Sequence, residues 1–300
     1  MTMPADPGSF ERVAVLGFGT MGAGIAQVVA RSGRGVTVLE TGDDRLADGR
    51  RRVEGFLTDG VGRGKLTSDD REAVLRRITG TTDVAALAGS ELVIEAVVED
   101  RDLKAELWPR VSEAVGTGAV LVTNTSALSV TDLAATVPEP SRFAGLHFFN
   151  PAPLMKLVEV VRALRTAPEV ITALTGFCES VGKTPVVVKD RPGFLINKLL
   201  MPYLNDVIQA YDDGLAIAAD LDSALELGLG DRMGPMTLLD VIGLDTHHHA
   251  TTSAYEATLD PQFAPPPLLS RMVAAGYLGD KSGRGFRAGG GLENPTEESS

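Results

Sequence analysis

The fold is decided by residues 12–22, which read Arg12-Val13-Ala14-Val15-Leu16-Gly17-Phe18-Gly19-Thr20-Met21-Gly22. The apolar run at 12–16 predicts a buried strand, and three glycines follow it in the spacing G-x-G-x-x-G. A helix is expected over residues 21–32, and a second apolar run at 36–39 ends at Glu40. Strand, glycine turn, helix and strand in this order form a βαβ unit, the context in which this glycine spacing indicates a dinucleotide site.

The glycine turn and Glu40 together predict the cofactor. Glycines at these positions permit a tight turn, close approach of the backbone to a pyrophosphate and close packing of the helix. The N–H groups at the start of the helix would face the phosphates. A carboxylate at the end of the second strand binds ribose hydroxyls and repels the 2′-phosphate of NADP. We therefore expect NAD, bound in part by Gly17, Gly19, Thr20, Met21, Gly22 and Glu40.

Strand and helix signals alternate along residues 1–190. Apolar strands are predicted at 92–98, 120–123, 143–149, 157–161 and 186–188, with helices between them. Residues 41–77 are charged and carry no strand signal, so we expect them to form an inserted helical arm. Such alternation predicts a largely parallel, doubly wound sheet covered on both faces, which is the Rossmann-type α/β class.

The pattern changes after residue 190. Apolar residues at helical spacing run from Ile196 to Tyr211, and Pro202 inside this run is expected to kink the helix. Further helices are predicted at 220–226, 236–242, 246–259 and 267–275, with no strand among them. The sequence thus predicts a dinucleotide-binding domain over residues 1–190 and an all-α C-terminal domain over 191–288. Residues 289–300, rich in Gly, Glu and Ser, predict a disordered tail.

The overall charge and the cysteine content exclude some partners and compartments. The chain has 28 basic and 40 acidic residues, a net charge of −12, so nucleic acid and anionic membranes would be repelled. No stretch is apolar and long enough to span a bilayer, and residues 1–10 lack the apolar run of a secretory signal. The single cysteine, Cys178, fits a reducing cytosol and is expected to be a small core residue. These features predict a cytoplasmic protein.

Position separates one of the four histidines from the rest. His247, His248 and His249 are consecutive, and consecutive residues of a helix point in different directions, so they predict a partly exposed helix and no metal site. His147 ends an apolar strand, and ligands bind at the carboxyl ends of strands in such sheets. On position alone, a structural and a catalytic role for His147 stay equally open.

Further short motifs follow the glycine turn along the chain. They are Glu95-Ala96-Val97-Val98-Glu99, Asn124-Thr125-Ser126, His147-Phe148-Phe149-Asn150-Pro151-Ala152-Pro153, Met155-Lys156-Leu157-Val158-Glu159, Pro192-Gly193-Phe194 with Asn197, Met233-Gly234-Pro235 and Lys281-Ser282-Gly283-Arg284-Gly285-Phe286. With these motifs, residues 11–287 resemble the 3-hydroxyacyl-CoA dehydrogenase family, in particular its single-function 3-hydroxybutyryl-CoA dehydrogenases.

The resemblance implies roles for individual residues. His147 matches the family's general base, and Glu159 matches the carboxylate that orients it. Ser126 and Asn197 match the residues that hydrogen-bond the substrate. The NAD pocket is implied to be lined also by Glu99, Lys104, Ser126, Asn150 and Lys281. Imidazole suits the base role because it titrates near neutral pH, and the imidazolium that forms needs a nearby carboxylate. The implied reaction is reversible oxidation of an L-3-hydroxyacyl-CoA to the 3-oxoacyl-CoA with NAD, in a homodimer whose helical domains pair.

Some local features depart from the family pattern. Ala127 follows Ser126 where relatives usually carry a serine, and Arg232 stands where they often have proline. Phe56 falls near the place where some relatives have a CoA-binding serine, and the arm lacks their lysine-rich tract. The arm's basic residues alone are typical of a solvated helix face. The hypothesis is that Arg63 and Lys65, with help from Arg50, Arg51 and Arg52, meet the phosphates of CoA.

Two rival functions stay open. The weakened basic arm favours a dehydrogenase that acts on a hydroxyacyl group carried by acyl carrier protein, as in the biosynthesis of polyketide extender units. The other rival is a non-catalytic NAD-binding regulatory or structural protein. The presence of Ser126, His147, Glu159 and Asn197 argues against this second rival.

Overall fold

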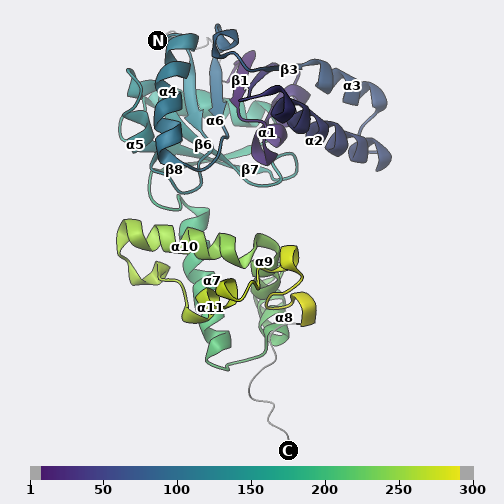
Figure 1. Cartoon of the computed structure of the whole chain (residues 1–300), viewed down its shortest axis with the longest axis vertical. Helices are drawn as coiled ribbons and strands as arrows, with labels where there is room; N and C mark the ends of the chain where they lie inside the picture. Colours follow the sequence, from purple (N-terminus) through teal and green to yellow (C-terminus); the bar gives the residue numbers. More distant parts are fainter. Residues whose placement is uncertain (1–7, 291–300) are drawn as a thin grey trace, which may run out of the picture. The chain divides into compact units, whose positions relative to one another are not determined.

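The computed structural model describes residues 8–290, and the chain separates into two compact units. The sheet unit ends at Phe194 and the helical unit begins at Leu195 (Figure 1). Of the tail predicted at 289–300, residues 291–300 lie outside the described range. Within that range, no helix has both the length and the apolar character needed to cross a membrane.

One eight-stranded sheet forms the centre of the sheet unit. Its strands lie in the order β3-β2-β1-β4-β5-β6-β7-β8. Their bounds are β1 Arg12–Leu16, β2 Gly35–Leu39, β3 Ile78–Thr81, β4 Leu92–Glu95, β5 Val120–Thr123, β6 Phe143–Phe148, β7 Leu157–Arg162 and β8 Thr184–Lys189. Neighbouring strands are parallel except for β6 and β7. The carboxyl ends of β1, β4, β5 and β6 therefore share one edge, and the strand order reverses between β1 and β4, where such sheets bind ligands.

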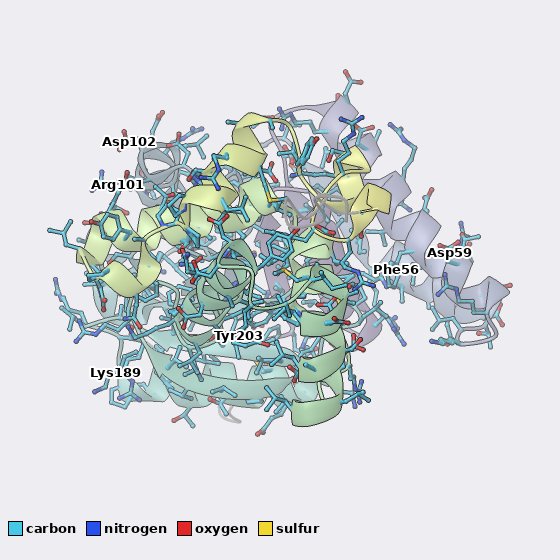
Figure 2. The ribbon with its side chains drawn as sticks, turned by 90° about the horizontal axis from the view of Figure 1, so that it is seen from below. Phe56, Asp59, Arg101, Asp102, Lys189 and Tyr203 are labelled. Carbon is cyan, nitrogen blue, oxygen red and sulfur yellow. The ribbon has the colours of Figure 1, made fainter. Side chains whose placement is uncertain are left out.

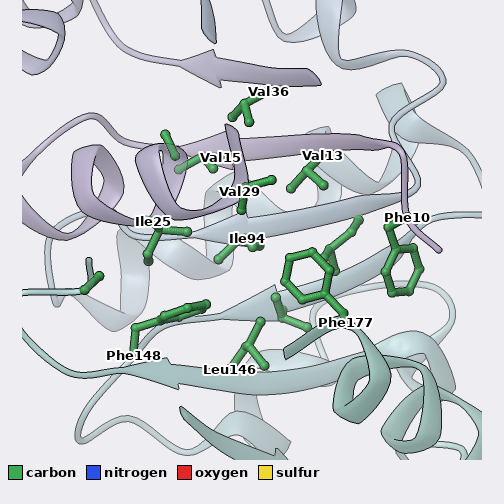
Figure 3. Packing of buried hydrophobic residues seen from close by; sticks show 14 of the residues in the cluster. Phe10, Val13, Val15, Ile25, Val29, Val36, Ile94, Leu146, Phe148 and Phe177 are labelled. Carbon is green, nitrogen blue, oxygen red and sulfur yellow. The ribbon is translucent and has the colours of Figure 1, made fainter. Parts of the chain in front are cut away.

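Helices cover both faces of this sheet, because successive side chains of a strand point to opposite faces. On β1, Val13 and Val15 join the core that includes α1 and α6, whereas Leu16 joins the core that includes α4 and α5. Figure 3 shows part of the first core, with Phe177 of α6 beside the strands. The helices of the unit are α1 Thr20–Arg31, α2 Asp43–Gly62, α3 Ser68–Arg76, α4 Arg101–Val115, α5 Val130–Ala134 and α6 Pro168–Ser180.

The predicted arm consists of α2 and α3, which lie between β2 and β3 in the chain. Helix α3 begins with a capping box, in which the Thr67 side chain accepts the Asp70 N–H and the Asp70 carboxylate accepts the Thr67 N–H. Helix α2 packs tightly beside the glycine turn, since a Cβ on Gly49 would stand 2.1 Å from the ring of Phe18. The arm thus joins the sheet next to the predicted cofactor site.

The helical unit has its own apolar core. Its helices are α7 Ile196–Asp212, α8 Ala218–Leu229, α9 Pro235–Ile242, α10 Leu244–Thr258 and α11 Pro267–Ala274. The buried carboxylate of Asp240 on α9 accepts the N–H groups of Phe286, Arg287 and Ala288. A Cβ on Gly285 would collide with Asp240 Oδ1 at 1.9 Å. The motif from Lys281 to Phe286 therefore has a structural reason: it allows the last described segment to close over this carboxylate.

The structure corrects some predicted elements. The strand expected at 92–98 ends at Glu95, because the Glu95 carboxylate accepts the Val97 N–H at 2.8 Å and the chain turns away. Strand β3 was not predicted, since only one of its four residues, Ile78, is a large apolar one. Strand β7 runs antiparallel to β6, because the connection 149–156 is too short for a crossover. Helix α7 contains Pro202 within one uninterrupted element, and the kink expected there stays a prediction.

Candidate active site

Most of the predicted site residues in the sheet unit lie at or just beyond the carboxyl ends of its parallel strands. His147 is the last residue but one of β6, Ser126 follows β5, and Glu99 follows β4. Gly17 follows β1, and Glu40 follows β2. Because these strands share one edge, the residues converge although they are spread over some 130 positions of the sequence.

The antiparallel pairing of β6 and β7 places Glu159 opposite His147. The two residues are direct partners in the strand register, and their side chains emerge on the same face. His147 Nδ1 is 2.7 Å from Glu159 Oε2, and both side chains are buried. An ionised carboxylate can only accept hydrogen bonds. The nitrogen that faces it, Nδ1, must therefore be the donor and carry the ring hydrogen. This leaves the lone pair of His147 on Nε2.

Ser126 lies on the other side of the imidazole ring. Its Oγ is 3.1 Å from His147 Nε2, and its side chain is exposed at the surface of the site. Glu159, His147 and Ser126 therefore form a continuous hydrogen-bonded line from the interior to the surface. Such a line can hold a proton on Nδ1 and accept a second proton at Nε2 from a group beside Ser126.

Aromatic rings limit the movement of this imidazole. The ring of Phe149 lies 4.5 Å from that of His147, centroid to centroid, and the ring of Phe194 lies 5.5 Å away in an edge-on arrangement. Phe194 has a positive φ of 49°, an unusual value for a bulky residue. Next to His147, the N–H of Phe148 donates to Asn124 Oδ1 at 2.8 Å, which ties the end of β6 to β5.

The glycine turn has the features that a dinucleotide needs. Gly17 has a φ of +90°, and a Cβ there would stand 2.8 Å from the Ala96 carbonyl oxygen. A Cβ on Gly22 would stand 2.0 Å from the Gly17 carbonyl oxygen. Both positions therefore exclude any side chain. Gly19 is different, because a Cβ there would have no described atom within 4 Å and would project into open space. The backbone at Gly19 is thus free to contact a ligand, beside the uncharged first turn of α1 that contains Thr20 and Met21.

Glu40 is held against this turn. Its Oε1 accepts the N–H of Phe18 at 2.8 Å, and its Oε2 accepts the N–H of Thr41 at 2.8 Å. The carboxylate is therefore fixed at the carboxyl edge, next to the turn that would cradle a pyrophosphate. Its negative charge and its acceptor oxygens fit ribose hydroxyls and oppose a third phosphate. The residues present fit NAD.

Glu99 and Lys104 form a cluster behind Ser126. Glu99 Oε1 accepts the backbone N–H groups of Ser126 (3.0 Å) and Ala127 (3.1 Å), and Lys104 Nζ lies 2.7 Å from Glu99 Oε2. Burial opposes the ionisation of Glu99. The charge and hydrogen bond of Lys104, together with the hydrogen bonds from the loop, outweigh this effect, so the pKa of Glu99 lies below its ordinary value. Lys104 itself is buried, with its ammonium turned toward carboxylates.

The remaining predicted site residues are positioned as follows. Asn150 is exposed at the end of the β6 segment and precedes Pro151 across a cis peptide bond. Asn197 stands in the first turn of α7, in the helical unit. Lys281 belongs to the same unit and forms an ion pair with Asp245. The roles of Asn197 and Lys281 toward substrate and cofactor stay predictions.

The basic residues of the arm are exposed. Arg63 and Lys65 follow the end of α2, and Arg52 lies on its surface. Arg50 and Arg51 are engaged within the arm, in ion pairs with Glu54 and Asp48. Figure 2 shows Phe56 and Asp59 on the same helix, and Phe56 is half-buried.

The other histidines and the cysteine have structural surroundings. The run from His247 to His249 lies on α10 and is partly exposed, as predicted: His249 is exposed, whereas His247 is buried and its Nε2 lies 3.0 Å from Asn205 Oδ1 in the core of the helical unit. Within residues 8–290, no group of three or more His, Cys, Asp or Glu is arranged to hold a metal ion. Cys178 is a buried core residue, as predicted, and burial raises the pKa of its thiol to about 12.

Sequence reasoning missed part of this site. Glu95, Thr125 and Phe194 lie within the motifs, but no role is predicted for them from the sequence. The signal for Glu95 was available, since a glutamate at the end of an otherwise apolar strand is a buried charge that needs partners. The contact of Phe194 with His147 could not be read from the sequence, because 47 positions separate the two residues.

Comparison with known proteins identifies the family. One family model, described as 3-hydroxyacyl-CoA dehydrogenase, NAD binding domain, matches residues 12–191, and a second, described as 3-hydroxyacyl-CoA dehydrogenase, C-terminal domain, matches residues 193–289. The 3-hydroxybutyryl-CoA dehydrogenase of Mycobacterium tuberculosis is 44% identical over 280 residues, which are 93% of this chain and 98% of that protein. The mitochondrial hydroxyacyl-coenzyme A dehydrogenase of Sus scrofa is 40% identical over 284 residues, which are 92% of this chain and 90% of that protein.

Solved structures agree with these matches. The (S)-3-hydroxybutyryl-CoA dehydrogenase of Ralstonia eutropha has a TM-score of 0.90 to this structure at 38% identity, over 93% of this chain and 99% of that chain. The predicted Rossmann-type fold with a helical C-terminal part, and the predicted cofactor NAD, are confirmed. The chain belongs to the 3-hydroxyacyl-CoA dehydrogenase family, whose members are NAD-dependent oxidoreductases.

Proposed function

We propose that this enzyme oxidises the 3-hydroxyl group of an L-3-hydroxyacyl-CoA to a 3-oxo group, reversibly, with His147 as the general base. The observation that carries the proposal is the position of the imidazole, with Nδ1 2.7 Å from Glu159 and Nε2 3.1 Å from Ser126 Oγ. An alcohol can be oxidised only if its hydroxyl proton leaves as the hydride departs from the carbon. Imidazole with a free Nε2 lone pair takes that proton near neutral pH.

Each residue of the line has a part in the proton transfer. The substrate hydroxyl, placed beside Ser126, gives its proton to His147 Nε2, and its oxygen becomes the 3-oxo group. Glu159 then faces an imidazolium, and its charge compensates the new one within a buried environment. In the reverse direction the same Nε2–H returns the proton to the carbonyl oxygen. The Ser126 hydroxyl can donate a hydrogen bond to that oxygen throughout.

The glycine turn and Glu40 would hold the cofactor next to this line. Gly17, Gly19 and Gly22 give the backbone room for the pyrophosphate, and Glu40 binds the ribose. NAD supplies the acceptor of the hydride that leaves C3. The protein's own contribution is to fix the base, the hydroxyl donor and the carboxylate on strand ends and loops whose backbone hydrogen bonds are already made.

The CoA moiety is proposed to contact the arm. Arg63 and Lys65 are exposed cations on an acidic protein, and CoA carries a 3′-phosphate and a pyrophosphate. Electrostatic attraction at this place would offset the repulsion by the overall charge of −12.

We also propose a homodimer formed through the helical unit. Large apolar side chains are exposed there, among them Leu227, Leu229, Val241 and Leu259. Burial of such side chains against a second copy would remove them from water. Sedimentation of the purified protein at micromolar concentration should give the mass of a dimer, and a monomer under these conditions would contradict the proposal.

The substrate proposal is tested by a comparison of two acyl carriers. Oxidation of NADH is followed with acetoacetyl-CoA and with the same acetoacetyl group on acyl carrier protein. We expect the higher kcat/KM for the CoA thioester. A much higher kcat/KM for the carrier-protein thioester would assign the enzyme to carrier-bound acyl groups instead, and no turnover of either would overturn the proposed reaction.

A further inference from the structure

A buried charge cluster lies between the sheet and the loop that carries Ser126. At its centre is Lys104, in the first turn of α4, whose side chain is only 1% exposed. Its ammonium lies 3.2 Å from Glu95 Oε1 and 2.7 Å from Glu99 Oε2. A buried ammonium is stable only when it is paired and hydrogen-bonded, so the two carboxylates fix its place.

Glu95 anchors the cluster to the sheet. It is the last residue of β4 and is fully buried. Its carboxylate accepts the Thr123 hydroxyl at 2.6 Å and the Val97 N–H at 2.8 Å, and Thr123 is its direct partner on β5. Burial raises the pKa of Glu95 above its ordinary value. All these partners are backbone groups or side chains on strand ends, so Lys104 is held from a rigid element.

Glu99 connects Lys104 to the loop after β5. Its Oε2 binds Lys104, while its Oε1 accepts the backbone N–H groups of Ser126 and Ala127 and the hydroxyl of Thr125. One carboxylate oxygen thus holds three consecutive loop residues. The loop in turn places Ser126 Oγ 3.1 Å from His147 Nε2.

We propose that Lys104 and Glu95 are positioning residues, which act through Glu99 to hold the 125–127 loop so that the Ser126 hydroxyl stays within reach of His147 Nε2 and the substrate oxygen. The assignment of the reacting groups rests on the proposed function. In this arrangement the Lys104 ammonium is buried against two carboxylates and supports the loop through Glu99. Without that ammonium, Glu99 would stay partly buried but lose its main counter-charge. Its carboxylate would then no longer be a fixed acceptor for the loop.

The test is a double-mutant cycle between Lys104 and Ser126. Lys104→Met keeps the length of the side chain and removes the charge. We expect it to lower kcat with acetoacetyl-CoA and saturating NADH by roughly 10–100-fold, the effect of misplacing a group in the site. In the Ser126→Ala background Lys104→Met should lower kcat little further, because the hydroxyl that the cluster positions is already absent. Arg110→Met, at an exposed position of the same helix, is the matched control.

Other outcomes would overturn the proposal. Equal losses of kcat from Lys104→Met in both backgrounds would show that Lys104 does not act through Ser126. A weaker NADH affinity with unchanged kcat would show that it serves the cofactor. If Lys104→Met does not fold, Glu95→Gln replaces it, with a smaller loss of kcat expected and the same absence of a further loss in the Ser126→Ala background.

A spectroscopic readout separates this proposal from the proposed function. The ring C–H signals of the four histidines can be assigned by NMR, and Ser126→Ala should move those of His147, because it removes the partner of Nε2. Lys104→Met should move the His147 signals in the same direction. Unmoved signals would refute the positioning role even in an active enzyme, whereas absent turnover with moved signals would refute only the proposed reaction.

Discussion

The proton on the His147 ring has a fixed place because of a single buried carboxylate. Glu159 lies opposite His147 in the strand register, so no loop movement is needed to bring them together. The cost of burying the Glu159 charge is offset by its hydrogen bond to Nδ1, and this interaction becomes stronger when the ring gains a proton. In the proposed reaction the same pair would keep the Nε2 lone pair available as the base and would stabilise the imidazolium after proton transfer.

Glu159→Gln tests the orientation of the ring. The amide can donate an N–H to Nδ1, which would move the ring hydrogen to Nε2 and remove the lone pair that acts as the base. We expect kcat to fall by roughly 10²–10⁴-fold while the affinity for NADH is kept. Glu169→Gln, at an exposed position of α6, is the control and should retain kcat. Normal turnover in a folded Glu159→Gln protein would remove the orienting role from this carboxylate.

Glu40 is proposed to determine the choice between NAD and NADP. Its carboxylate is fixed by the N–H groups of Phe18 and Thr41, so it cannot swing away to admit a 2′-phosphate. The unaltered enzyme should have a much higher kcat/KM with NADH than with NADPH, and Glu40→Ala should narrow this ratio. The Ala variant should also raise the KM for NADH, because the turn loses an acceptor. Equal kcat/KM for both reduced cofactors in the unaltered enzyme would contradict this account.

Elements with a strict backbone requirement could be predicted from the sequence. The turn after β1 could be predicted because Gly17 needs a positive φ and Gly22 leaves no room for a side chain, so the motif had one physical reading. Strand β3 could not, since Thr79, Gly80 and Thr81 form an edge strand through backbone pairing with β2 alone. The early end of β4 also escaped prediction, because it depends on a hydrogen bond from Val97 to the Glu95 side chain.

The arm formed by α2 and α3 is expected to contribute binding without chemistry. Replacing Arg63 and Lys65 together by glutamine should raise the KM for acetoacetyl-CoA several-fold with little change in kcat, because exposed charge contacts are weak individually. The effect should shrink as salt is added, since mobile ions screen exposed charges. Arg162 and Arg165, exposed on another part of the sheet unit, are the matched pair for a control. An unchanged KM at low salt would exclude the arm from CoA recognition.

The whole molecule consists of two units that each bury an apolar core. The change from alternating elements to helices alone could be predicted, because the hydrophobic period changes near residue 190, and the two units of the structure meet between Phe194 and Leu195. The interior of the helical unit could not be predicted in the same way. Its core contains the polar group of Asn205, His247 and Thr251, and the hydrogen bonds among these three residues join positions up to 46 apart in the sequence.

This buried polar group predicts how stability depends on pH. Burial, helped by the neighbouring His248, lowers the pKa of His247 from its ordinary 6.5 to about 4. Between these values the unfolded chain binds a proton that the folded chain does not, so the free energy of unfolding decreases as pH falls from 6.5 to 4. The full loss would be about 3 kcal/mol at most.

Urea unfolding of the helical unit at pH 7 and pH 5 measures this effect. His247→Gln keeps an N–H for Asn205 Oδ1 and cannot titrate, so its stability should decrease less between the two pH values than that of the unaltered protein. His249→Gln, at an exposed position of the same helix, should behave like the unaltered protein. The same pH dependence in all three proteins would refute the prediction for His247.

His147 is proposed to remove the hydroxyl proton, and the turnover of His147→Gln tests this role most directly. The variant is compared with the unaltered enzyme in the oxidation of NADH with acetoacetyl-CoA, after circular dichroism and NADH titration have verified its fold and its cofactor binding. We expect kcat to fall by roughly 10²–10⁴-fold while the affinity for NADH is retained. A folded, NADH-binding His147→Gln protein with near-normal kcat would contradict this role.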